Sequence, residues 1–358
     1  MTSVLYITPS LGYSGLSRRL SLLAVHLARE RFQPQVIVLG GPSPGGEALR
    51  KAGIAVHDLG WQRPIDVRPL AELRRLVTDA RPDVIHTWGS AGLCAALVSG
   101  VARPRQLVVS GALPLVGEPG WIAAGLLRSV GRIVAFGGAE TERYRRAGVS
   151  AERLVQAPLA HDAAWPPTEP APDNVRPPDD GRLLLGIGPL HGYKGFRDAV
   201  WAFDILHMLY GDLRLVIAGD GPDRPRVEAF IRVTGTYPRA RCLGTVAELA
   251  PFRQRALLAW VPGRAGGVQA ALEAMAAGLP VVASRIPALA EVVDHGETGF
   301  LTTPCDKAEL ARHTRRLLDD DALRQKIGAA AQRRVAEKFA PNPMADICAT
   351  MYERGLAS

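Results

Sequence analysis

Short apolar runs alternate along the whole chain with longer stretches that carry apolar residues at helical spacing. Runs such as residues 4–8 and 256–261 are continuous and apolar, which is typical of strands buried on both faces of a parallel sheet. Residues 16–29, in contrast, repeat leucine every three or four positions and predict an amphipathic helix. This alternation of strands and helices predicts an α/β fold built from doubly wound sheets.

A proline-rich, acidic stretch at residues 163–180 divides this pattern into two halves. It contains six prolines, and such a composition predicts a stiff, extended linker. We therefore expect a Rossmann-like domain at residues 1–162, a second one at residues 181–340, and a last helix at residues 341–358, after Pro341 interrupts the chain.

A glycine loop followed by a helix is predicted within residues 256–284, between two short strands. Gly266 and Gly267 lie directly before a run of strong helix formers. A helix N-terminus lined by glycine leaves backbone N–H groups free and presents the positive end of the helix dipole, so it can hold a phosphate. Helical spacing places Gln269 and Glu273 on one face, from which an acidic side chain could reach ribose hydroxyls. Taken alone, a plain crossover helix with a glycine turn explains the stretch better.

The composition is that of a globular protein with a positive charge. Of its 358 residues, 47% are hydrophobic and 22% are charged, which is enough for two buried cores. Lysine and arginine number 43 against 35 acidic residues, a formal net charge of +8. A basic surface suits a nucleoside diphosphate, an anionic lipid head group or a nucleic acid. Because the charges are scattered and form no basic tail, we do not expect nucleic-acid binding.

The four cysteines are far apart and show neither disulfide-framework nor zinc spacing. The chain begins directly with a strand pattern rather than a basic leader, and no apolar run approaches the ~20 residues that span a bilayer. We therefore expect a cytoplasmic protein without a cofactor or a metal site, at most peripheral on the inner face of the membrane. Residues 121–132 could form an amphipathic contact with anionic lipid, although a helix buried on one side explains them better.

Two motifs in the second half follow one another in a distinctive order. The sequence LEAMAAGLPVVAS at residues 272–284 is followed by HGETGFL at residues 295–301. This arrangement resembles the C-terminal half of the retaining GT-B glycosyltransferases of the large family four, also called glycosyl transferases group 1. The resemblance is strong over residues 183–339 and weaker over residues 3–162. It implies a GT-B fold, in which two Rossmann-like doubly wound domains face a cleft and the C-terminal helix crosses back onto the first domain.

The resemblance also implies roles for individual residues. Lys194 matches a lysine that neutralises the donor diphosphate, and Glu273 matches a glutamate that holds the ribose, so these two are the expected catalytic residues. The other donor-binding candidates lie in loops or at a helix start: Gly15, Gly188, Thr245, Val246, Gly266, Gly267, Val268 and Gln269. On the acceptor side the candidates are Gly12, in the first glycine loop, and His86, at a predicted strand end where ligands bind in such sheets. A lone histidine is nevertheless more often structural.

Three positions depart from the family pattern. Pro189 stands where an arginine belongs, Ala265 where the first glutamate of a pair belongs, and Ala112 where many members carry a histidine. Fixed cations stabilise the charge of a departing diphosphate, and proline supplies neither a charge nor an N–H group. Arg264 or Arg182 could compensate in part.

Two classes of function fit these residues. The first is a retaining glycosyltransferase that moves a sugar from a UDP- or GDP-sugar to a hydroxyl of a glycan or lipid-linked glycan. It needs no metal, because lysine and helix dipoles replace the ion, and in the family the departing phosphate is thought to act as the base. The second is a catalytically degenerate GT-B protein that binds a nucleotide or a partner without turnover. We favour the enzyme, and the resemblance implies polysaccharide or cell-envelope assembly as its setting.

Overall fold

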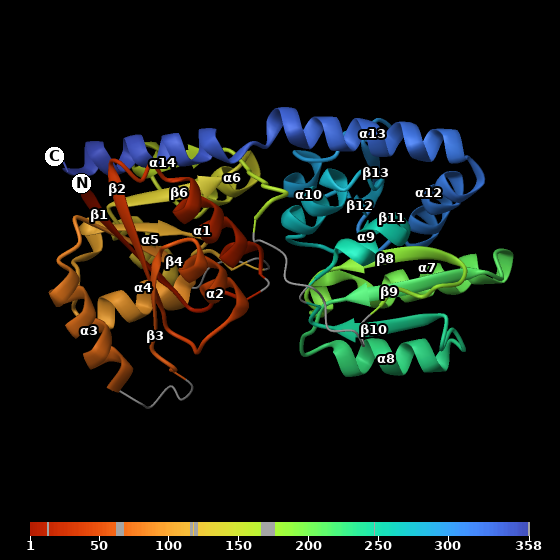
Figure 1. Ribbon diagram of the computed structural model, residues 1–358, viewed down its shortest axis with the longest axis horizontal. Helices are drawn as coiled ribbons and strands as arrows, with labels where there is room; N and C mark the ends of the chain where they lie inside the picture. Colours follow the sequence, from red (N-terminus) through yellow and green to blue (C-terminus); the bar gives the residue numbers. More distant parts are fainter. Residues whose placement is uncertain are drawn as a thin grey trace. The chain divides into compact units, whose positions relative to one another are not determined.

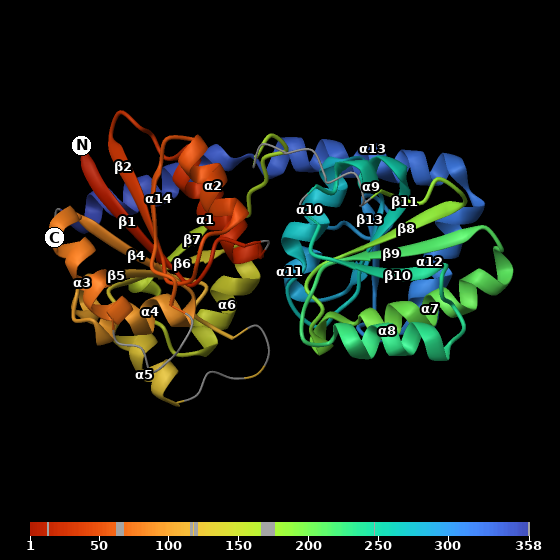
Figure 2. The same cartoon turned by 60° about the horizontal axis from the view of Figure 1, so that its bottom comes forward.

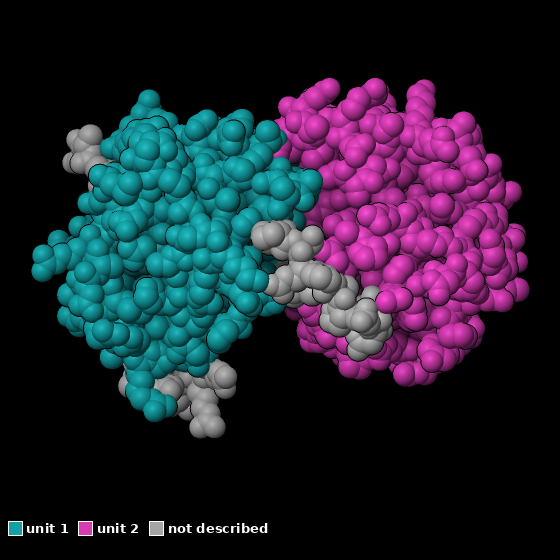
Figure 3. Space-filling view, in the orientation of Figure 1, with its two compact units in different colours: residues 1–166, 340–358 teal, residues 167–339 magenta. Residues whose placement is uncertain are grey.

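The chain forms two compact units in a computed structural model that describes residues 1–12, 14–61, 68–114, 117, 121–165, 176–246 and 248–356. Each unit is a parallel sheet with helices packed on it, as Figures 1 and 2 show. Unit 1 comprises residues 1–166 and 340–358, and unit 2 comprises residues 167–339 (Figure 3). The central part of the proline-rich stretch, residues 166–175, lies outside the described residues.

The sheet of unit 1 has seven described strands in the order β3-β2-β1-β4-β5-β6-β7. Its strands are continuous apolar runs, as predicted; β1, for example, is buried from Val4 to Ile7. The strands are β1 (Thr2–Thr8), β2 (Phe32–Val38), β3 (Ala55–Asp58), β4 (Val84–Trp88), β5 (Leu107–Ser110), β6 (Arg132–Phe136) and β7 (Leu154–Ala157). The helices are α1 (Gly15–His26), α2 (Pro44–Lys51), α3 (Arg68–Ala80), α4 (Gly89–Val98), α5 (Trp121–Ser129), α6 (Gly138–Arg146) and α14 (Pro341–Leu356).

The last helix, α14, belongs to unit 1, as the predicted GT-B fold requires. It packs against α1, and its residue Tyr352 is buried with the phenol oxygen 2.7 Å from Nδ1 of His86 on β4. The expected break at Pro341 lies between α13, which ends at Lys338, and α14. Pro341 is itself the first residue of α14, a position at which the missing N–H group of proline has no helical partner to lose.

The sheet of unit 2 has six described strands in the order β10-β9-β8-β11-β12-β13. They are β8 (Arg182–Ile187), β9 (Leu213–Ala218), β10 (Ala240–Gly244), β11 (Ala256–Val261), β12 (Val281–Ser284) and β13 (Gly299–Thr302). The helices are α7 (Phe196–Leu209), α8 (Arg224–Val233), α9 (Ala250–Arg255), α10 (Val268–Ala276), α11 (Pro287–Ala290), α12 (Lys307–Asp319) and α13 (Asp321–Lys338). The sequence pattern does not predict α8, α9 or α11.

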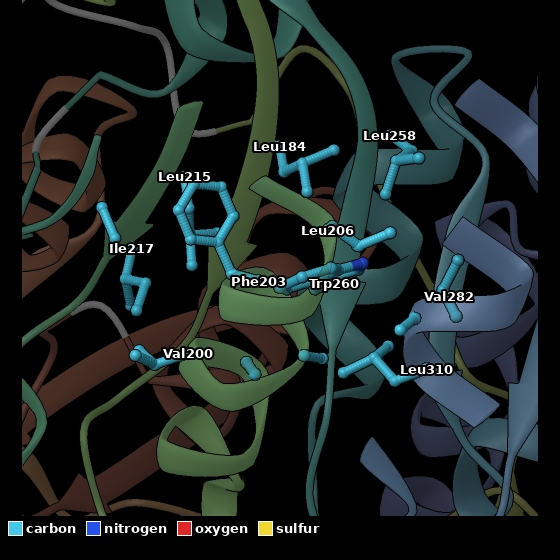
Figure 4. Packing of buried hydrophobic residues seen from close by; sticks show 14 of the residues in the cluster. Leu184, Val200, Phe203, Leu206, Leu215, Ile217, Leu258, Trp260, Val282 and Leu310 are labelled. Atoms are coloured by element: carbon cyan, nitrogen blue, oxygen red, sulfur yellow. The ribbon is translucent and has the colours of Figure 1, made fainter. Parts of the chain in front are cut away.

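A large part of the core of unit 2 lies between its sheet and the helices α7 and α12 (Figure 4). Leu184 on β8 and Trp260 on β11 pack with Phe203 on α7 and Leu310 on α12. Trp260 is fully buried, and its Nε1 donates a hydrogen bond of 2.8 Å to the hydroxyl of Thr314, so its polar atom is satisfied. This packing fixes the strands whose carboxyl ends carry the loops of the candidate site.

The strand order reverses once within each sheet. In unit 2, β9 lies on one side of β8 and β11 on the other, and in unit 1, β2 and β4 flank β1 in the same way. Because the strands are parallel, the loops after β8 and β11 leave the same edge of the sheet side by side. Ligands of doubly wound folds bind at such a reversal, outside the carboxyl ends of the strands.

Candidate functional site

Two loops meet at the strand-order reversal of unit 2, one after β8 and one after β11. A Cβ on Gly263 would lie 3.0 Å from Cα of Lys194, and a Cβ on Gly195 would lie 3.2 Å from the Gly263 nitrogen. These distances leave little room for a side chain, so the glycines allow the two backbones to pack closely. The backbone nitrogen of Arg264 donates a hydrogen bond of 2.8 Å to the oxygen of Tyr193 and joins the loops.

Helix α10 begins where the glycine pair predicts it, at Val268. Gly266 and Gly267 both have left-handed φ angles, 69° and 91°, and Gly267 is the N-cap residue. Because glycine has no side chain, the N-cap residue accepts no side-chain hydrogen bond from the N–H groups of the first turn. This helix end therefore presents N–H donors and the positive end of a dipole, and an anion can satisfy both.

Lys194 places a positive charge beside this helix end. The residue is only 7% exposed, and its Nζ donates a hydrogen bond of 3.0 Å to the carbonyl oxygen of Ala265. Lys194, Ala265, Gly266 and Gly267 line the same small hollow. Desolvation by burial lowers the pKa of Lys194 to about 8, so the ammonium carries its charge at neutral pH but at a cost in solvation. A bound anion would offset that cost.

Glu273 lies in the second turn of α10 with its carboxylate partly shielded from water. Nε2 of Gln269 lies 3.5 Å from its Oε1, which confirms that the two side chains share a face of the helix. Nη1 of Arg253, on α9, lies 3.7 Å from its Oε2. Sequence reasoning missed Arg253 because it did not predict α9. The available signal was weak, a proline at Pro251 followed by polar and basic residues just before the strand β11.

The remaining unit 2 candidates lie at the same edge of the sheet. Gly188 follows β8 directly, and Thr245 and Val246 follow β10, which is two strands away. Thr245 is exposed and Val246 is buried. With strands spaced about 5 Å apart, the edge from β8 to β10 extends about 10 Å beside the hollow. The structure therefore brings Gly188, Thr245, Val246 and the start of α10 to one edge of the sheet, with Glu273 one turn further along α10.

The positions that depart from the family pattern carry no charge in the structure. Pro189 is exposed in the loop after β8, and Ala265 is buried with its carbonyl oxygen bound to Lys194. The expectation that Arg182 could compensate is wrong, because it begins β8 at the opposite edge of the sheet and pairs there with Asp212. Arg264 lies in the loop after β11, exposed, with its Nε 3.0 Å from Sγ of Cys305.

The glycine candidates of unit 1 lie around the loop after β1. A Cβ on Gly12 would meet no atom within 4 Å, so this position is open. Gly15 is the first residue of α1, whose N-cap residue Ser14 accepts a hydrogen bond of 3.1 Å from the Ser17 nitrogen. Unlike α10, this helix therefore has a side-chain cap. Ala112, the third departure, is buried, and its nitrogen donates a hydrogen bond of 3.0 Å to the hydroxyl of Tyr144.

The expectation that His86 ends its strand and faces an acceptor is wrong. Strand β4 continues to Trp88, and His86 has no exposed surface. Its Nδ1 lies 2.7 Å from the hydroxyl of Tyr352 and its Nε2 lies 2.8 Å from the hydroxyl of Ser110. Burial lowers the pKa of His86 to about 3, so the imidazole is neutral. A side chain buried in this way links α14 to the sheet and cannot contact an acceptor.

Other sequence expectations concern metals, membranes and thiols. In the part of the chain that the structure describes, no three His, Cys, Asp or Glu side chains are grouped as ligands for a metal ion. Among the described helices, none combines the length and the apolar character needed to cross a bilayer. The amphipathic segment expected at residues 121–132 forms α5, but the side chains of residues 121–123 lie outside the described part. The free thiols are Cys94 and Cys305, which are exposed, Cys242, which is intermediate, and Cys348, which is buried.

Comparison with known proteins identifies the family. Residues 13–164 match the family Glycosyltransferase Family 4, and residues 181–320 match Glycosyl transferases group 1. Glycogen synthase of Mycobacterium tuberculosis is 30% identical over 312 residues, which cover 80% of this chain and 72% of that protein. The crystal structure of Anabaena Alr3699/HepE in complex with UDP and glucose matches 99% of this chain and 100% of its own, with a TM-score of 0.80 at 18% identity. Sucrose-phosphate synthase from Thermosynechococcus elongatus matches 100% of both chains, with a TM-score of 0.80 at 19% identity.

Two doubly wound parallel sheets in one chain, with a last helix that returns to the first sheet, are the architecture of the GT-B class. The chain belongs to the glycosyl transferases group 1 family, and it is a glycosyltransferase. The family and the fold class that the sequence motifs indicate are therefore confirmed.

Proposed function

We propose that the chain transfers a sugar from a UDP- or GDP-sugar to a hydroxyl acceptor, with retention of configuration and without a metal ion. The observation that carries this proposal is the pairing of a buried lysine with an open helix N-terminus in unit 2. Lys194 faces the same hollow as Gly266 and Gly267. A diphosphate is the part of a sugar nucleotide whose charge both features favour.

Lys194 and the start of α10 act on the departing group. As the bond between the sugar and the diphosphate breaks, negative charge grows on the departing phosphate oxygen. A cation and backbone N–H groups that are already in place stabilise that charge without reorganisation, so they favour the transition state over the bound donor. These groups supply the positive charge that a divalent cation gives elsewhere, which supports a metal-independent reaction.

Glu273 is proposed to recognise the ribose of the donor. It lies six residues beyond Gly267, or about 9 Å along the helix axis at 1.5 Å per residue. A carboxylate at that distance from the phosphate site can accept hydrogen bonds from the ribose hydroxyls. Thr245 and Val246, at the end of β10, are placed to contact the base through their backbone groups.

Retention is proposed from the resemblance to the retaining members of the family, by a front-face route that needs no protein nucleophile. The hollow is compatible with that route, since among its described lining residues there is no aspartate or glutamate. The acceptor oxygen forms its bond to the anomeric carbon on the face from which the diphosphate departs. The acceptor proton passes to the departing phosphate oxygen, so the reaction balances without a protein base.

The relatives suggest where to look for substrates. The Anabaena protein was solved with UDP and glucose, which makes UDP-glucose the first donor to test. The mycobacterial relative is a glycogen synthase, which supports a glycan acceptor and a place in polysaccharide assembly.

A second candidate function is nucleotide binding without turnover. Its support is that neither Pro189 nor Ala265 puts a charge at the hollow. Removing one charge stabiliser typically raises a barrier by about 3 kcal/mol, a factor of about 100 in rate. Arg264, in the same loop as Ala265, is a candidate to compensate in part.

The experiment is a turnover assay with UDP-glucose and GDP-mannose, a panel of glycan acceptors and EDTA. Released UDP or GDP gives the rate, and NMR of the product gives the anomeric configuration. We expect turnover that EDTA leaves intact, that Lys194→Ala lowers at least about 100-fold, and that Lys326→Ala, an exposed lysine on α13, leaves unchanged.

Each part of the proposal has its own contrary result. A full rate in Lys194→Ala would overturn the site assignment. An inverted product would overturn retention, and a rate that EDTA abolishes and magnesium restores would overturn metal independence. Nucleotide binding without turnover on any acceptor would favour the second candidate.

A further inference from the structure

Helix α9 brings a basic residue against the carboxylate of the candidate site. Phe252 is fully buried and anchors this short helix in unit 2. The next residue, Arg253, extends to α10, where its Nη1 lies 3.7 Å from Oε2 of Glu273. The two residues come from different helices, so their approach is a product of tertiary packing.

This ion pair is better shielded from water than the exposed pair between Arg146 and Glu142 on α6. The side chains of Arg253 and Glu273 are 19% and 16% exposed, whereas those of Arg146 and Glu142 on α6 are 76% and 48% exposed. Water and salt screen an exposed pair, and its long side chains remain mobile. A shielded pair constrains the orientation of both partners more strongly.

The carboxylate of Glu273 is approached by donors from two helices. Arg253 lies beside Oε2, and Nε2 of Gln269, one turn earlier on α10, lies 3.5 Å from Oε1. A guanidinium presents its N–H donors in a rigid, planar fork, so its approach restricts the directions in which the carboxylate can turn. An oriented carboxylate is the acceptor that two adjacent ribose hydroxyls require.

We infer that Arg253 is a positioning residue for recognition of the donor ribose. It holds the side chain of Glu273 turned so that the carboxylate accepts hydrogen bonds from the ribose hydroxyls, and Arg253 itself need not touch the donor. This inference rests on the proposed function, which gives Glu273 its role toward the ribose. A merely structural pair would stabilise α9 against α10 and leave the recognition of ribose hydroxyls unchanged.

The test compares UDP and GDP with their 2′,3′-dideoxy counterparts, which lack both ribose hydroxyls. Affinities are measured by isothermal titration calorimetry on the full chain and its variants. Arg253→Leu should weaken binding of the ribose nucleotide about tenfold or more, the size of a charge-assisted hydrogen bond, and weaken the dideoxy nucleotide less than about threefold. Arg253→Lys should recover part of the difference. Arg146→Leu, which removes an exposed pair on α6, is the matched control and should change neither affinity.

Three results would overturn the inference, and they are distinguishable. An equal loss of affinity for the ribose and the dideoxy nucleotide would mean that Arg253 acts on the stability of the fold or on the electrostatic potential of the whole site. An unchanged preference in Arg253→Leu, with the preference lost in Glu273→Gln, would overturn the inference and leave the proposed function intact. A preference unchanged in Glu273→Gln, or no binding of either nucleotide by the wild-type chain, would overturn the ribose assignment and the inference with it. If Arg253→Leu does not fold, Arg253→Gln, which removes the charge and keeps a polar side chain, carries the same comparison.

Discussion

Lys194 should make the stability of unit 2 depend on pH in a way that a single substitution removes. Its ammonium is buried beside the carbonyl of Ala265, and desolvation lowers its pKa from 10.5 to about 8. The folded pKa is therefore below the unfolded value. Between pH 8 and pH 10.5 the unfolded chain binds more protons than the folded one, so the free energy of unfolding rises with pH in that window.

The size of this effect follows from the pKa values. A shift from 10.5 to about 8 corresponds to a penalty of about 3 kcal/mol at pH 7. The linkage relation removes about 1 kcal/mol of this penalty between pH 7 and pH 9. Lys194→Met keeps much of the side-chain length and removes the charge. At pH 7 the variant is relieved of the penalty but leaves the Ala265 carbonyl without its partner, which costs about 1–3 kcal/mol.

The assay is urea unfolding at pH 7 and at pH 9 for the wild type, Lys194→Met and Lys326→Met. Differences between wild type and variant are compared, because the titration of all other groups then cancels. The stability of the wild type relative to Lys194→Met should rise by about 1 kcal/mol from pH 7 to pH 9. Relative to Lys326→Met, an exposed site, it should stay within about 0.5 kcal/mol. If the stability of the wild type relative to Lys194→Met and its stability relative to Lys326→Met change with pH by the same amount, Lys194 is not desolvated and the reasoning about its charge is refuted.

Three further predictions concern the loops and unit 1. Gly267→Ala should lower the free energy of unfolding by about 1–3 kcal/mol, because the φ of Gly267 is 91° and the new Cβ would lie 2.5 Å from Cγ1 of Val261. The control Gly12→Ala, at an open position, should change the free energy of unfolding by less than about 0.5 kcal/mol. Equal effects of the two substitutions in urea unfolding would contradict this account. His86, with its pKa lowered to about 3, should make the free energy of unfolding of unit 1 fall by about 3 kcal/mol between pH 7 and pH 4, since the unfolded chain takes up the proton first. In urea unfolding at the two pH values, the free energy of unfolding of His86→Gln should fall by that much less. An equal fall in the wild type and in His86→Gln would count against burial of the imidazole. Pro189→Arg, at an exposed position, should tighten calorimetric UDP binding about tenfold by adding a cation beside the diphosphate, and no change would place the diphosphate elsewhere.

The strands and the start of α10 could be predicted because their signals are local. A strand buried on both faces is a continuous apolar run, and a glycine pair before strong helix formers marks a helix start. Gln269 and Glu273 could be placed on one face because helical spacing alone determines it. Each of these features depends on neighbours in the sequence.

Features that depend on distant residues could not be predicted in the same way. The two ring nitrogens of His86 contact the hydroxyls of Ser110 and Tyr352, and nothing beside His86 in the sequence indicates either contact. Arg253 meets Glu273 only because α9 packs near α10. Arg182 differs from these, because strand direction alone places it at the edge of the sheet opposite the site.

The central claim is that a nucleoside diphosphate binds at Lys194 and the start of α10. The most direct measurement is thermal unfolding of the wild type, Lys194→Ala and Lys326→Ala with UDP, GDP and ADP. At about a hundred times its dissociation constant, a ligand adds about 2.7 kcal/mol of stability, which is readily seen as a shift. We expect one nucleotide to stabilise the wild type and Lys326→Ala but not Lys194→Ala. The same stabilisation in all three proteins, or in none of them, would contradict the claim.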